Sequence, residues 1–454
     1  MNPETIVAIA TAPGRGGIGI IRLSGDKALS IATSITGIQL APRHAYLCSF
    51  HDNAGRALDS GICLFFPGPH SFTGEDVVEL QAHGSPIILD LLLRETCKLG
   101  ARQADPGEFS QRAYLNDKID LTQAEAIADL INSTTARAAL NASRSLQGAF
   151  SQKIEALVAQ VTQVRIYVEA AIDFPEEEID YIKNSQLKEQ LASIIQQFDA
   201  VACEARQGRL VQEGIKLVIA GKPNAGKSSL LNALSGQDSA IVTAIEGTTR
   251  DVLREHIEID GMPMYIVDTA GLRDSDNEIE QEGIRRAWAE IESADHILLV
   301  VDGNILSNSN VDYASMRHEN FYHLKREIPV TIVNNKCDLS NHLPEVRDYD
   351  DMTVIYLSAK TGAGVDLLKQ HLKTRMGYND SEEGNFSARR RHLQSLEQAK
   401  NYLLNGQEQL LQAGAGELLA EDLRLCQNSL GEITGAIHSD ELLGTIFSSF
   451  CIGK

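Results

Sequence analysis

Short apolar runs, separated by stretches that contain Gly and Pro, characterise the N-terminal part of the chain. The runs are Ile6–Ile9, Ile18–Leu23, Ile62–Phe66 and Val77–Leu80. Runs of this length, rich in β-branched residues and bounded by turn-forming residues, are typical of strands. We therefore expect residues 1–118 to form a small α+β domain.

Two later segments show the periodicity of helices instead. Apolar residues recur there at alternating spacings of four and three, which places them on one helix face. The first stripe is Phe150, Ile154, Leu157, Val161, Val164 and Val168, and the second is Leu419, Leu423, Cys426, Leu430, Ile433 and Ile437. Because each stripe has to be buried, we expect the two helices to pack in one bundle; burial in two separate cores is the alternative.

Strands and helical stretches alternate between these two stripes. The strands are short and continuously apolar, and they cover residues 216–220, 264–268, 296–302, 330–335 and 353–358. This pattern is typical of a parallel sheet covered on both faces. The polar run Gly377–Asn385 is expected to be an exit linker.

The patterns together predict a multidomain chain in which one domain is inserted into another. We expect an α+β domain at 1–118, a helical bundle domain in two halves at 119–211 and 378–454, and an α/β domain inserted at 212–377.

Composition narrows the classes of protein. Lys and Arg number 41 against 62 Asp and Glu, a formal charge of −21, so the chain should not coat nucleic acid non-specifically. It could still bind RNA locally through a basic patch or a basic partner. The seven cysteines include no C-x-x-C pair, which argues against disulfides and a thiolate zinc site. We find no secretory signal or bilayer-spanning run, and expect no membrane association and a cytoplasmic location.

The segment from Gly221 to Ser228 fits the phosphate-binding pattern G-x-x-x-x-G-K-[ST], between a predicted strand and a predicted helix. Its glycines let backbone N–H groups turn towards phosphate oxygens, and the helix N-terminus adds positive potential. Lys227 is expected to contact the β- and γ-phosphates, and the Ser228 hydroxyl to bind Mg²⁺. The inserted domain is therefore predicted to be a P-loop domain.

Four further motifs follow in the order expected of a GTPase: Gly247–Asp251, Asp268–Gly271, Asn335–Asp338 and Ser358–Lys360. The first two are expected to serve Mg²⁺ and the γ-phosphate. A carboxylate in the third can accept two parallel hydrogen bonds from the guanine N1–H and 2-amino groups, which adenine lacks. Backbone N–H groups of the fourth can bind guanine O6. GTP rather than ATP is the predicted nucleotide.

One position departs from the Ras-like pattern. Ras-like proteins carry Gln after D-x-x-G to orient the attacking water, and here that position is Leu272. Another group must therefore orient the water. The candidates are Glu278, Glu280, Glu282, Arg250, Arg254 and Arg273, and the sequence alone favours a solvated surface charge for each.

Segments along the whole chain resemble the MnmE (TrmE) family of bacterial tRNA-modification GTPases, within the TrmE-Era-EngA-like GTPases. The resemblance is carried by residues 13–25, 66–84, 208–234, 246–257 and 268–273 and by the terminal FCIGK at 450–454. It implies a homodimer formed through the N-terminal domain, which would bind methylene- or formyl-tetrahydrofolate. It also implies a heterotetramer with the partner MnmG (GidA), which alone carries FAD, and K⁺-activated GTP hydrolysis. The implied substrate is tRNA, modified with an aminomethyl or carboxymethylaminomethyl group at C5 of the wobble uridine.

The resemblance also assigns roles to individual residues. It implies K⁺ ligands at Asn224, Thr243, Ile245 and Thr248, and Mg²⁺ ligands at Ser228 and Thr249. Glu280 would orient the attacking water and is therefore a candidate catalytic residue. Lys227, which is expected to contact the β- and γ-phosphates, is the other. The motifs and the resemblance together predict that GTP is contacted by Asn224, Ala225, Gly226, Lys227, Ser228, Ser229, Thr243, Ala244, Ile245, Glu246, Gly247, Thr248, Thr249, Asp268, Thr269, Ala270, Gly271, Asn335, Lys336, Asp338, Ser358, Ala359 and Lys360.

The implied folate contacts are Arg22, Glu79, Lys118 and Lys454. One carboxylate for a pterin ring and basic groups for an anionic glutamate tail fit that ligand, although Arg22 and Lys118 also suit structural roles. Cys451 is a candidate catalytic thiol, with inert packing as the alternative. The basic cluster Arg389–His392 is either a solvated helix face or a contact for tRNA or the partner.

A second function shares the same nucleotide motifs. A regulatory GTPase that acts as an assembly factor, for example in ribosome biogenesis, would bind GTP without modification chemistry. That function favours a basic RNA-binding appendage. The charge of −21 and the folate-like N-terminal domain favour the modifying enzyme.

Overall fold

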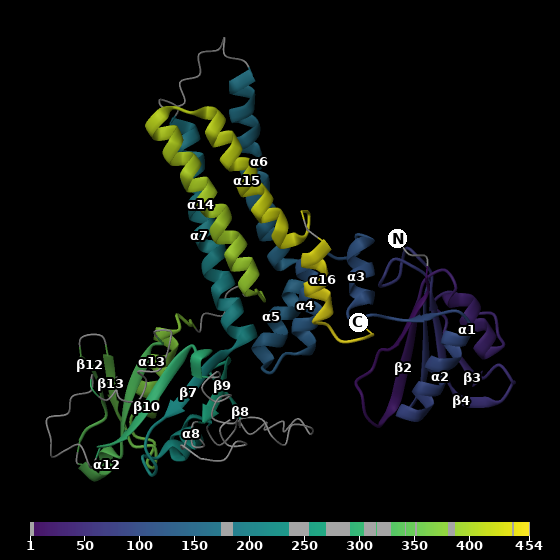
Figure 1. Ribbon diagram of the computed structural model, residues 1–454, viewed down its shortest axis with the longest axis horizontal. Helices are drawn as coiled ribbons and strands as arrows, with labels where there is room; N and C mark the ends of the chain where they lie inside the picture. Colours follow the sequence, from purple (N-terminus) through teal and green to yellow (C-terminus); the bar gives the residue numbers. More distant parts are fainter. Residues whose placement is uncertain are drawn as a thin grey trace, which may run out of the picture. The chain divides into compact units, whose positions relative to one another are not determined.

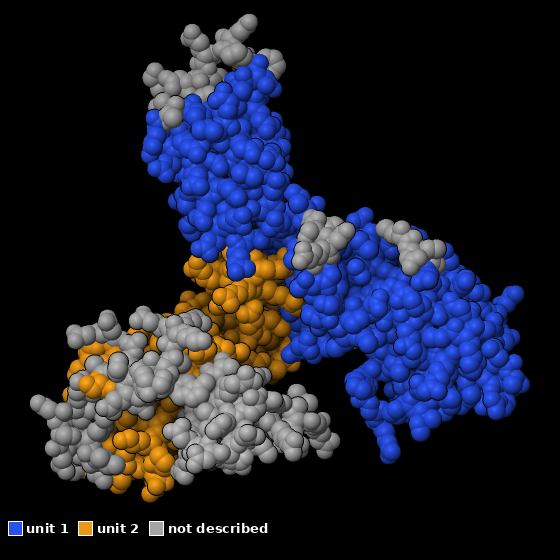
Figure 2. Space-filling model, viewed as in Figure 1, with its two compact units in different colours: residues 1–132, 143–199, 394–454 blue, residues 133–142, 200–393 orange. Residues whose placement is uncertain are grey.

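The computed structural model describes residues 4–173, 185–235, 254–268, 291–303, 315, 328–340, 342–349, 352–379, 386–437 and 440–453. Contacts divide the chain into two units, which Figure 2 colours separately. Unit 1 comprises residues 1–132, 143–199 and 394–454, and unit 2 comprises residues 133–142 and 200–393. The predicted boundaries near residues 118, 211 and 377 stay predictions, because the units group residues by contact alone.

A six-stranded sheet with the order β3-β4-β5-β2-β1-β6 forms the N-terminal part of unit 1 (Figure 1). Its strands are β1 (Ile6–Ile9), β2 (Gly16–Ser24), β3 (Tyr46–His51), β4 (Ala57–Phe66), β5 (Val77–Gly84) and β6 (Arg102–Gln103). Neighbouring strands are antiparallel except β1 and β6. Helices α1 (Ala28–Thr36) and α2 (Pro86–Lys98) share one apolar core with this sheet. The predicted α+β architecture is confirmed.

The helical part contains α3 (Glu108–Leu115), α4 (Leu121–Ile131), α5 (Ala136–Leu146), α6 (Ala149–Asp173), α7 (Ser185–Glu213), α14 (Arg390–Ala413), α15 (Gly416–Thr434) and α16 (Asp440–Ser448). Helix α4 begins with a capping box, in which the Asp120 side chain and the Gln123 side chain each accept a hydrogen bond from the other's backbone N–H. Such a box satisfies two N–H groups that a helix start otherwise leaves unpaired.

The two predicted helix stripes pack against each other. All six residues of the first stripe are buried on α6, and five of the second are buried on α15. Helices α6 and α15 are in contact and lie side by side in Figure 1. The expectation of one bundle rather than two separate cores is therefore confirmed.

The prediction that Ile437 continues the second stripe is wrong. Helix α15 ends at Thr434, because Gly435 takes the left-handed conformation with φ 86°. A Cβ at Gly435 would lie 2.5 Å from the hydroxyl oxygen of Tyr114, which donates a hydrogen bond to the Gly435 carbonyl. Ile437 lies beyond this turn and is 44% exposed.

Unit 2 contains a seven-stranded sheet with the order β12-β13-β11-β10-β7-β9-β8. Its strands are β7 (Ile215–Ala220), β8 (Arg254–Ile259), β9 (Met262–Asp268), β10 (His296–Asp302), β11 (Val330–Asn335), β12 (Glu345–Tyr349) and β13 (Met352–Tyr356). The five predicted strands run parallel. The edge strands β8 and β12 are antiparallel to their neighbours and were not predicted, since their sequences REHIEI and EVRDY are mostly polar.

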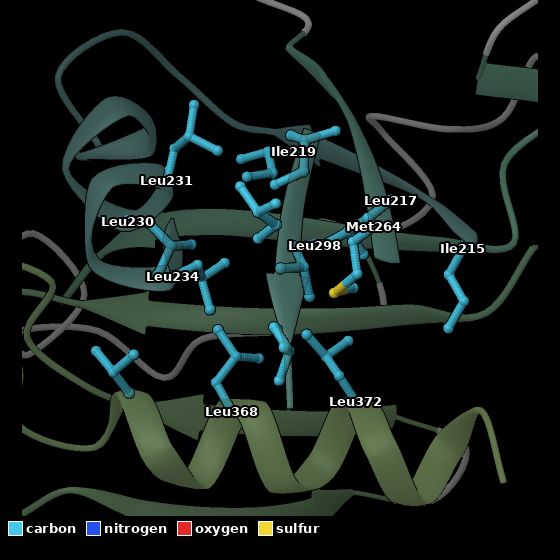
Figure 3. Packing of buried hydrophobic residues seen from close by; sticks show 14 of the residues in the cluster. Ile215, Leu217, Ile219, Leu230, Leu231, Leu234, Met264, Leu298, Leu368 and Leu372 are labelled. Atoms are coloured by element: carbon cyan, nitrogen blue, oxygen red, sulfur yellow. The ribbon is translucent and has the colours of Figure 1, made fainter. Parts of the chain in front are cut away.

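Alternate residues of these parallel strands enter two different cores, so the sheet is buried on both faces as predicted. Leu217, Ile219 and Leu298 belong to one core, together with residues of α8 (Lys227–Ser235) and α13 (Val365–Arg375) (Figure 3). Val218 and Leu299 belong to the other core. A short helix, α12 (Cys337–Ser340), follows β11. Among the described helices, none is both long and apolar enough to span a bilayer.

The start of β10 buries a histidine. His296 is 1% exposed, and its Nε2 lies 2.8 Å from Thr331 Oγ1, which lies 2.9 Å from His371 Nε2. Burial lowers the pKa of His296 to about 4, with smaller effects from His371 and Arg375. The pKa of a histidine in the unfolded chain is about 6.5. Between these values only the unfolded state binds the proton, so the neutral buried form loses stability as the pH falls.

We expect the free energy of unfolding of unit 2 to fall by about 3 kcal/mol between pH 6.5 and pH 4 because of this histidine. Urea unfolding, followed by hydrogen exchange of the β10 amides, measures the effect. His296→Asn should remove most of this pH dependence, whereas His70→Asn, at an exposed position, should preserve it. Equal pH dependence in the wild type and His296→Asn would contradict the assignment.

Candidate guanine-nucleotide site

The loop after β7 adopts backbone conformations that favour glycine. Gly221 has φ 145°, and a Cβ there would lie 2.2 Å from the carbonyl oxygen of Val300. Gly226 has φ 98°, and a Cβ there would lie 2.2 Å from Asn335 Nδ2. Asn224, between them, is also left-handed, with φ 63°. Both glycines of the phosphate-binding pattern are therefore required by the fold as well as by a phosphate ligand.

Lys227 lies over this loop at the start of α8. Its Nζ donates hydrogen bonds to the carbonyl oxygens of Gly221 at 2.9 Å and Lys222 at 3.3 Å. Ser228 and Ser229 follow it and are exposed. A half-buried lysine, two exposed serines and the positive end of a helix therefore meet at this loop, which is an arrangement suited to phosphate.

Asn335 connects three loops at the end of the sheet. It is 2% exposed, and its Nδ2 donates to the Ala225 carbonyl at 2.9 Å. Its Oδ1 accepts hydrogen bonds from the N–H groups of Lys336 at 2.8 Å and Ala359 at 2.9 Å. The amide that was predicted to contact GTP thus also holds the phosphate loop against the two loops that carry the base-recognition motifs.

Lys336 also holds the phosphate loop in place, through its side chain. Its Nζ donates to the Asn224 carbonyl and lies 2.7 Å from Asp302 Oδ2. Asp302 is the last residue of β10 and was not predicted as a site residue. Its position at the carboxyl end of a parallel strand was the available signal, since ligands of α/β sheets bind at that edge.

The residues expected to read the base differ in exposure. Asp338 is exposed in the first turn of α12. Ser358 and Ala359 are buried, and Lys360 is exposed. The Ser358 hydroxyl accepts a hydrogen bond from the Thr361 N–H at 3.3 Å, which stabilises the turn. The carboxylate of Asp338 thus faces solvent above a loop that its neighbours hold in place.

Several predicted residues lie outside the part of the chain that the structure describes. They are Thr243, Ala244, Ile245, Glu246, Gly247, Thr248, Thr249, Arg250, Thr269, Ala270, Gly271, Arg273, Glu278, Glu280, Glu282 and Lys454. Residues 380–385 of the predicted exit linker also lie outside it. Asp268 ends β9 and is paired with Ile219 of β7, directly before the phosphate loop.

Two of the predicted folate residues form a pair on the N-terminal sheet. Arg22 of β2 lies opposite Glu79 of β5, with Arg22 Nη2 2.9 Å from Glu79 Oε1. The guanidinium also lies 5.9 Å from the ring centres of Phe72 and Phe109. A partly exposed ion pair beside two aromatic rings is suited to a flat, polar heterocycle.

The loop that carries Phe72 and the C-terminal tail both lie near the Arg22–Glu79 pair. Lys118 Nζ donates to the Pro69 carbonyl at 2.9 Å, in the loop that also carries Phe72. Gly453 lies against β1, where a Cβ would be 2.3 Å from the Ile9 carbonyl oxygen. Ile9 is paired with Ile21, the neighbour of Arg22, and Cys451 is exposed in the tail. The structure therefore brings the tail close to the strand that carries Arg22.

The basic cluster at the start of α14 does not form one solvated face. His392 is 2% exposed, and its Nδ1 accepts a hydrogen bond from the Arg389 N–H at 3.0 Å. Arg390 is exposed. The histidine of this cluster is therefore part of the helix start rather than a surface contact.

A mainly parallel sheet with this phosphate loop, followed by an exposed Asp338 on a loop tied to it, defines a P-loop GTPase domain, here inserted into a helical domain. A model of the MnmE helical domain matches residues 121–451, and a model of the GTP-binding protein TrmE N-terminus matches residues 5–118. The tRNA modification GTPase MnmE of Pectobacterium atrosepticum is 57% identical over 454 residues, covering 100% of both chains. The chain belongs to the MnmE family of tRNA modification GTPases.

Solved structures are similar to part of the chain. The G domain of the FeoB iron transporter of T. maritima is 23% identical, with 36% of this chain and 98% of that chain covered and a TM-score of 0.26. Era of Aquifex aeolicus, bound to GDP and AlF4⁻, is 24% identical, with 42% and 67% covered and a TM-score of 0.26.

Proposed function

We propose that this GTPase, together with the FAD-dependent partner MnmG (GidA), modifies C5 of the wobble uridine of certain tRNAs. The added group is aminomethyl or carboxymethylaminomethyl, and a tetrahydrofolate supplies its one-carbon unit. The observation that carries the proposal is the full-length match to a tRNA modification GTPase at 57% identity. FAD belongs to the partner only, and the location is cytoplasmic.

The described residues fit a magnesium nucleotide. Ser228 is exposed at the start of α8, and its hydroxyl oxygen is a ligand that Mg²⁺ accepts. Among the described residues, no cluster of three His, Cys, Asp or Glu side chains could hold a metal by itself. We infer that Ser228, Thr249 and phosphate oxygens would together bind the ion. When bound, Mg²⁺ would neutralise negative charge on the transferred phosphoryl group, while Lys227 holds the phosphates.

A potassium site beside the phosphates fits Asn224. The Lys336 ammonium contacts the Asn224 carbonyl, while the Asn224 residue itself is exposed. Its side-chain oxygen, with Thr243, Ile245 and Thr248, would bind K⁺, and the ion would offset charge that develops on the phosphoryl group. Glu280 would orient the attacking water, because this chain has Leu272 at the position where Ras-like proteins carry the water-orienting glutamine.

The N-terminal sheet is the proposed folate site. Glu79 would accept hydrogen bonds from a pterin ring, and Arg22, Lys118 and Lys454 would contact the anionic glutamate tail. The tail of the chain supports this proposal, because Gly453 lies on β1 beside the strand that carries Arg22. Cys451 is exposed next to it and is the candidate thiol. The homodimer would form through this domain.

Reconstitution with the partner, tRNA, GTP and methylene-tetrahydrofolate tests the proposal directly. Mass spectrometry of digested tRNA should show the modified wobble uridine in KCl buffer, with much less product in NaCl. Arg22→Ala should lose the product because the folate contact is lost, while GTP hydrolysis persists. Arg94→Ala, which removes an exposed arginine from α2, is the matched control. Modification without folate, or equal yield with Arg22→Ala, would contradict the proposal.

A further inference from the structure

The turn between β8 and β9 is held by residues from other parts of unit 2. Asp260 and Gly261 are both left-handed, with φ 51° and 86°, as a two-residue hairpin turn requires. The Tyr378 hydroxyl donates to the Asp260 carbonyl at 2.8 Å. Lys373 Nζ, on α13, lies 2.6 Å from Asp260 Oδ2. The turn is therefore fixed through both its backbone and its side chain.

Arg137 of α5 completes this clamp, which we define as Arg137, Asp260, Gly261, Lys373 and Tyr378. Arg137 Nη1 donates to the Tyr378 hydroxyl at 2.8 Å, and the guanidinium lies 5.4 Å from the centre of the same ring. A Cβ at Gly261 would lie 3.0 Å from Arg137 Cδ, so the approach of the arginine depends on glycine at this position. Tyr378 is 4% exposed, which strengthens these polar contacts.

The turn end of the same hairpin also packs against the end of α7. A Cβ at Gly214, directly after α7, would lie 2.7 Å from the Tyr265 ring and 2.9 Å from the Pro263 carbonyl oxygen. On α7, Gln207 accepts a hydrogen bond from the Asn379 N–H at 3.0 Å, next to Tyr378. Two helices, α5 and α7, are thus joined to one end of the hairpin.

The other end of the hairpin lies beside the phosphate loop. Asp268 at the end of β9 is paired with Ile219 of β7, just before the phosphate loop. Strand β9 spans from there to the turn, a length of about 20 Å at roughly 3.3 Å per residue. The chain enters β8 after residue 253 and leaves β9 at residue 268, between the segments that carry Thr249 and Gly271. The hairpin therefore connects the GTP site to the clamp directly.

Helix α5 carries the connection onward along the chain. Its residues up to 142 belong to unit 2, and its residues from 143 belong to unit 1. A displacement of β9 along its own axis would act on Arg137 through the polar contacts of Tyr378 and Asp260. A helix transmits such a displacement because its backbone is hydrogen-bonded throughout.

We propose that Arg137 and Tyr378 are positioning residues that transmit the nucleotide state of the GTP site, through the β8–β9 hairpin, to helix α5. The inference rests on the proposed function only in that Thr249 and Gly271 respond to the γ-phosphate. Because coupling between two sites is reciprocal, removing the Arg137–Tyr378 hydrogen bond also changes the ratio of the affinities for GTP and GDP.

Hydrogen exchange of the full-length protein tests the proposal, with GDP compared with the non-hydrolysable analogue GMPPNP. In the wild type, peptides covering residues 136–146 should differ in exchange rate between the nucleotides by about fivefold or more, the lower end of typical coupling. Tyr378→Phe removes the bridging hydroxyl and keeps the ring, and Arg137→Met removes the guanidinium and keeps the stem. Both variants should reduce the difference below about twofold, well under typical coupling.

Arg144→Ala is the matched control, since this exposed arginine lies on the same helix outside the clamp. This control variant should keep the full difference in exchange rate between the GDP and GMPPNP states. Melting temperatures and binding of a fluorescent GDP establish that each variant is folded and binds nucleotide. An unchanged difference in both clamp variants, or none in a wild type that binds both nucleotides, would overturn the proposal. Failure of the tRNA modification assay with the difference intact would instead count against the proposed function alone.

Discussion

Asp338→Asn is expected to weaken GTP binding by about 10²–10⁴-fold. The Asp338 carboxylate is exposed in the first turn of α12, where it can accept both the N1–H and the 2-amino hydrogens of guanine. Each hydrogen bond to a charged group contributes about 1.5–3 kcal/mol, so losing two gives a loss of about 3–6 kcal/mol. Asparagine also offers an N–H group where guanine presents donors. Equilibrium titration with a fluorescent GTP analogue measures the loss.

The control for this variant is a change of base rather than of residue. Xanthine carries a carbonyl in place of the guanine 2-amino group, so the amide of Asp338→Asn can donate to it. The variant should therefore bind xanthosine triphosphate more tightly than GTP, which shows that its fold and phosphate site are intact. If Asp338→Asn kept wild-type affinity for GTP, Asp338 would not be the base-reading residue.

Gly226→Ala is expected to reduce GTP affinity by more than about 100-fold. A Cβ at this position would lie 2.2 Å from Asn335 Nδ2, and the φ of 98° is unfavourable for alanine. The loop has to move away from Asn335, which breaks its hydrogen bond to the Ala225 carbonyl. Since three loops share Asn335, both the phosphate contacts and the base contacts are disturbed, at a combined cost of about 3 kcal/mol or more.

Gly362→Ala separates this effect from backbone strain alone. Gly362 has φ 82° in the same domain, but no atom lies within 4 Å of the position of its Cβ. We expect this control to change the melting temperature slightly and to leave GTP affinity within a few-fold of the wild type. Isothermal titration with GTP measures the affinity of both variants. Equal losses of GTP affinity would mean that crowding against Asn335 does not cause the effect of Gly226→Ala.

The sequence predicted those elements whose burial follows one simple pattern. The parallel strands are buried on both faces, so they appear as short, largely apolar runs, such as residues 297–301. The stripes on α6 and α15 follow the helical repeat because each helix buries one face in the bundle. The phosphate loop was recognisable because its glycines and Lys227 are fixed in spacing by the backbone geometry that phosphate binding needs.

Features set by tertiary contacts were not predicted. Strands β8 and β12 lie at sheet edges and have polar sequences that carry little strand signal. Ile437 matched the helical spacing, but Gly435 ends the helix before it. The bonds of Asn335 to two other loops, and of Arg137 to Tyr378, join residues far apart in the sequence. No local pattern reveals such pairs.

Competition between nucleotides tests the central claim most directly, namely that the loop from Gly221 to Ser228 holds the phosphates while Asp338 selects guanine. The purified full-length protein is loaded with a fluorescent GDP, and unlabelled nucleotides are titrated against it. The account predicts that GTP and GDP displace the label at stoichiometric concentrations, whereas ATP fails at about a thousandfold excess, because adenine offers no donor to the Asp338 carboxylate and leaves it unpaired against the base. Displacement by ATP as readily as by GTP would contradict it.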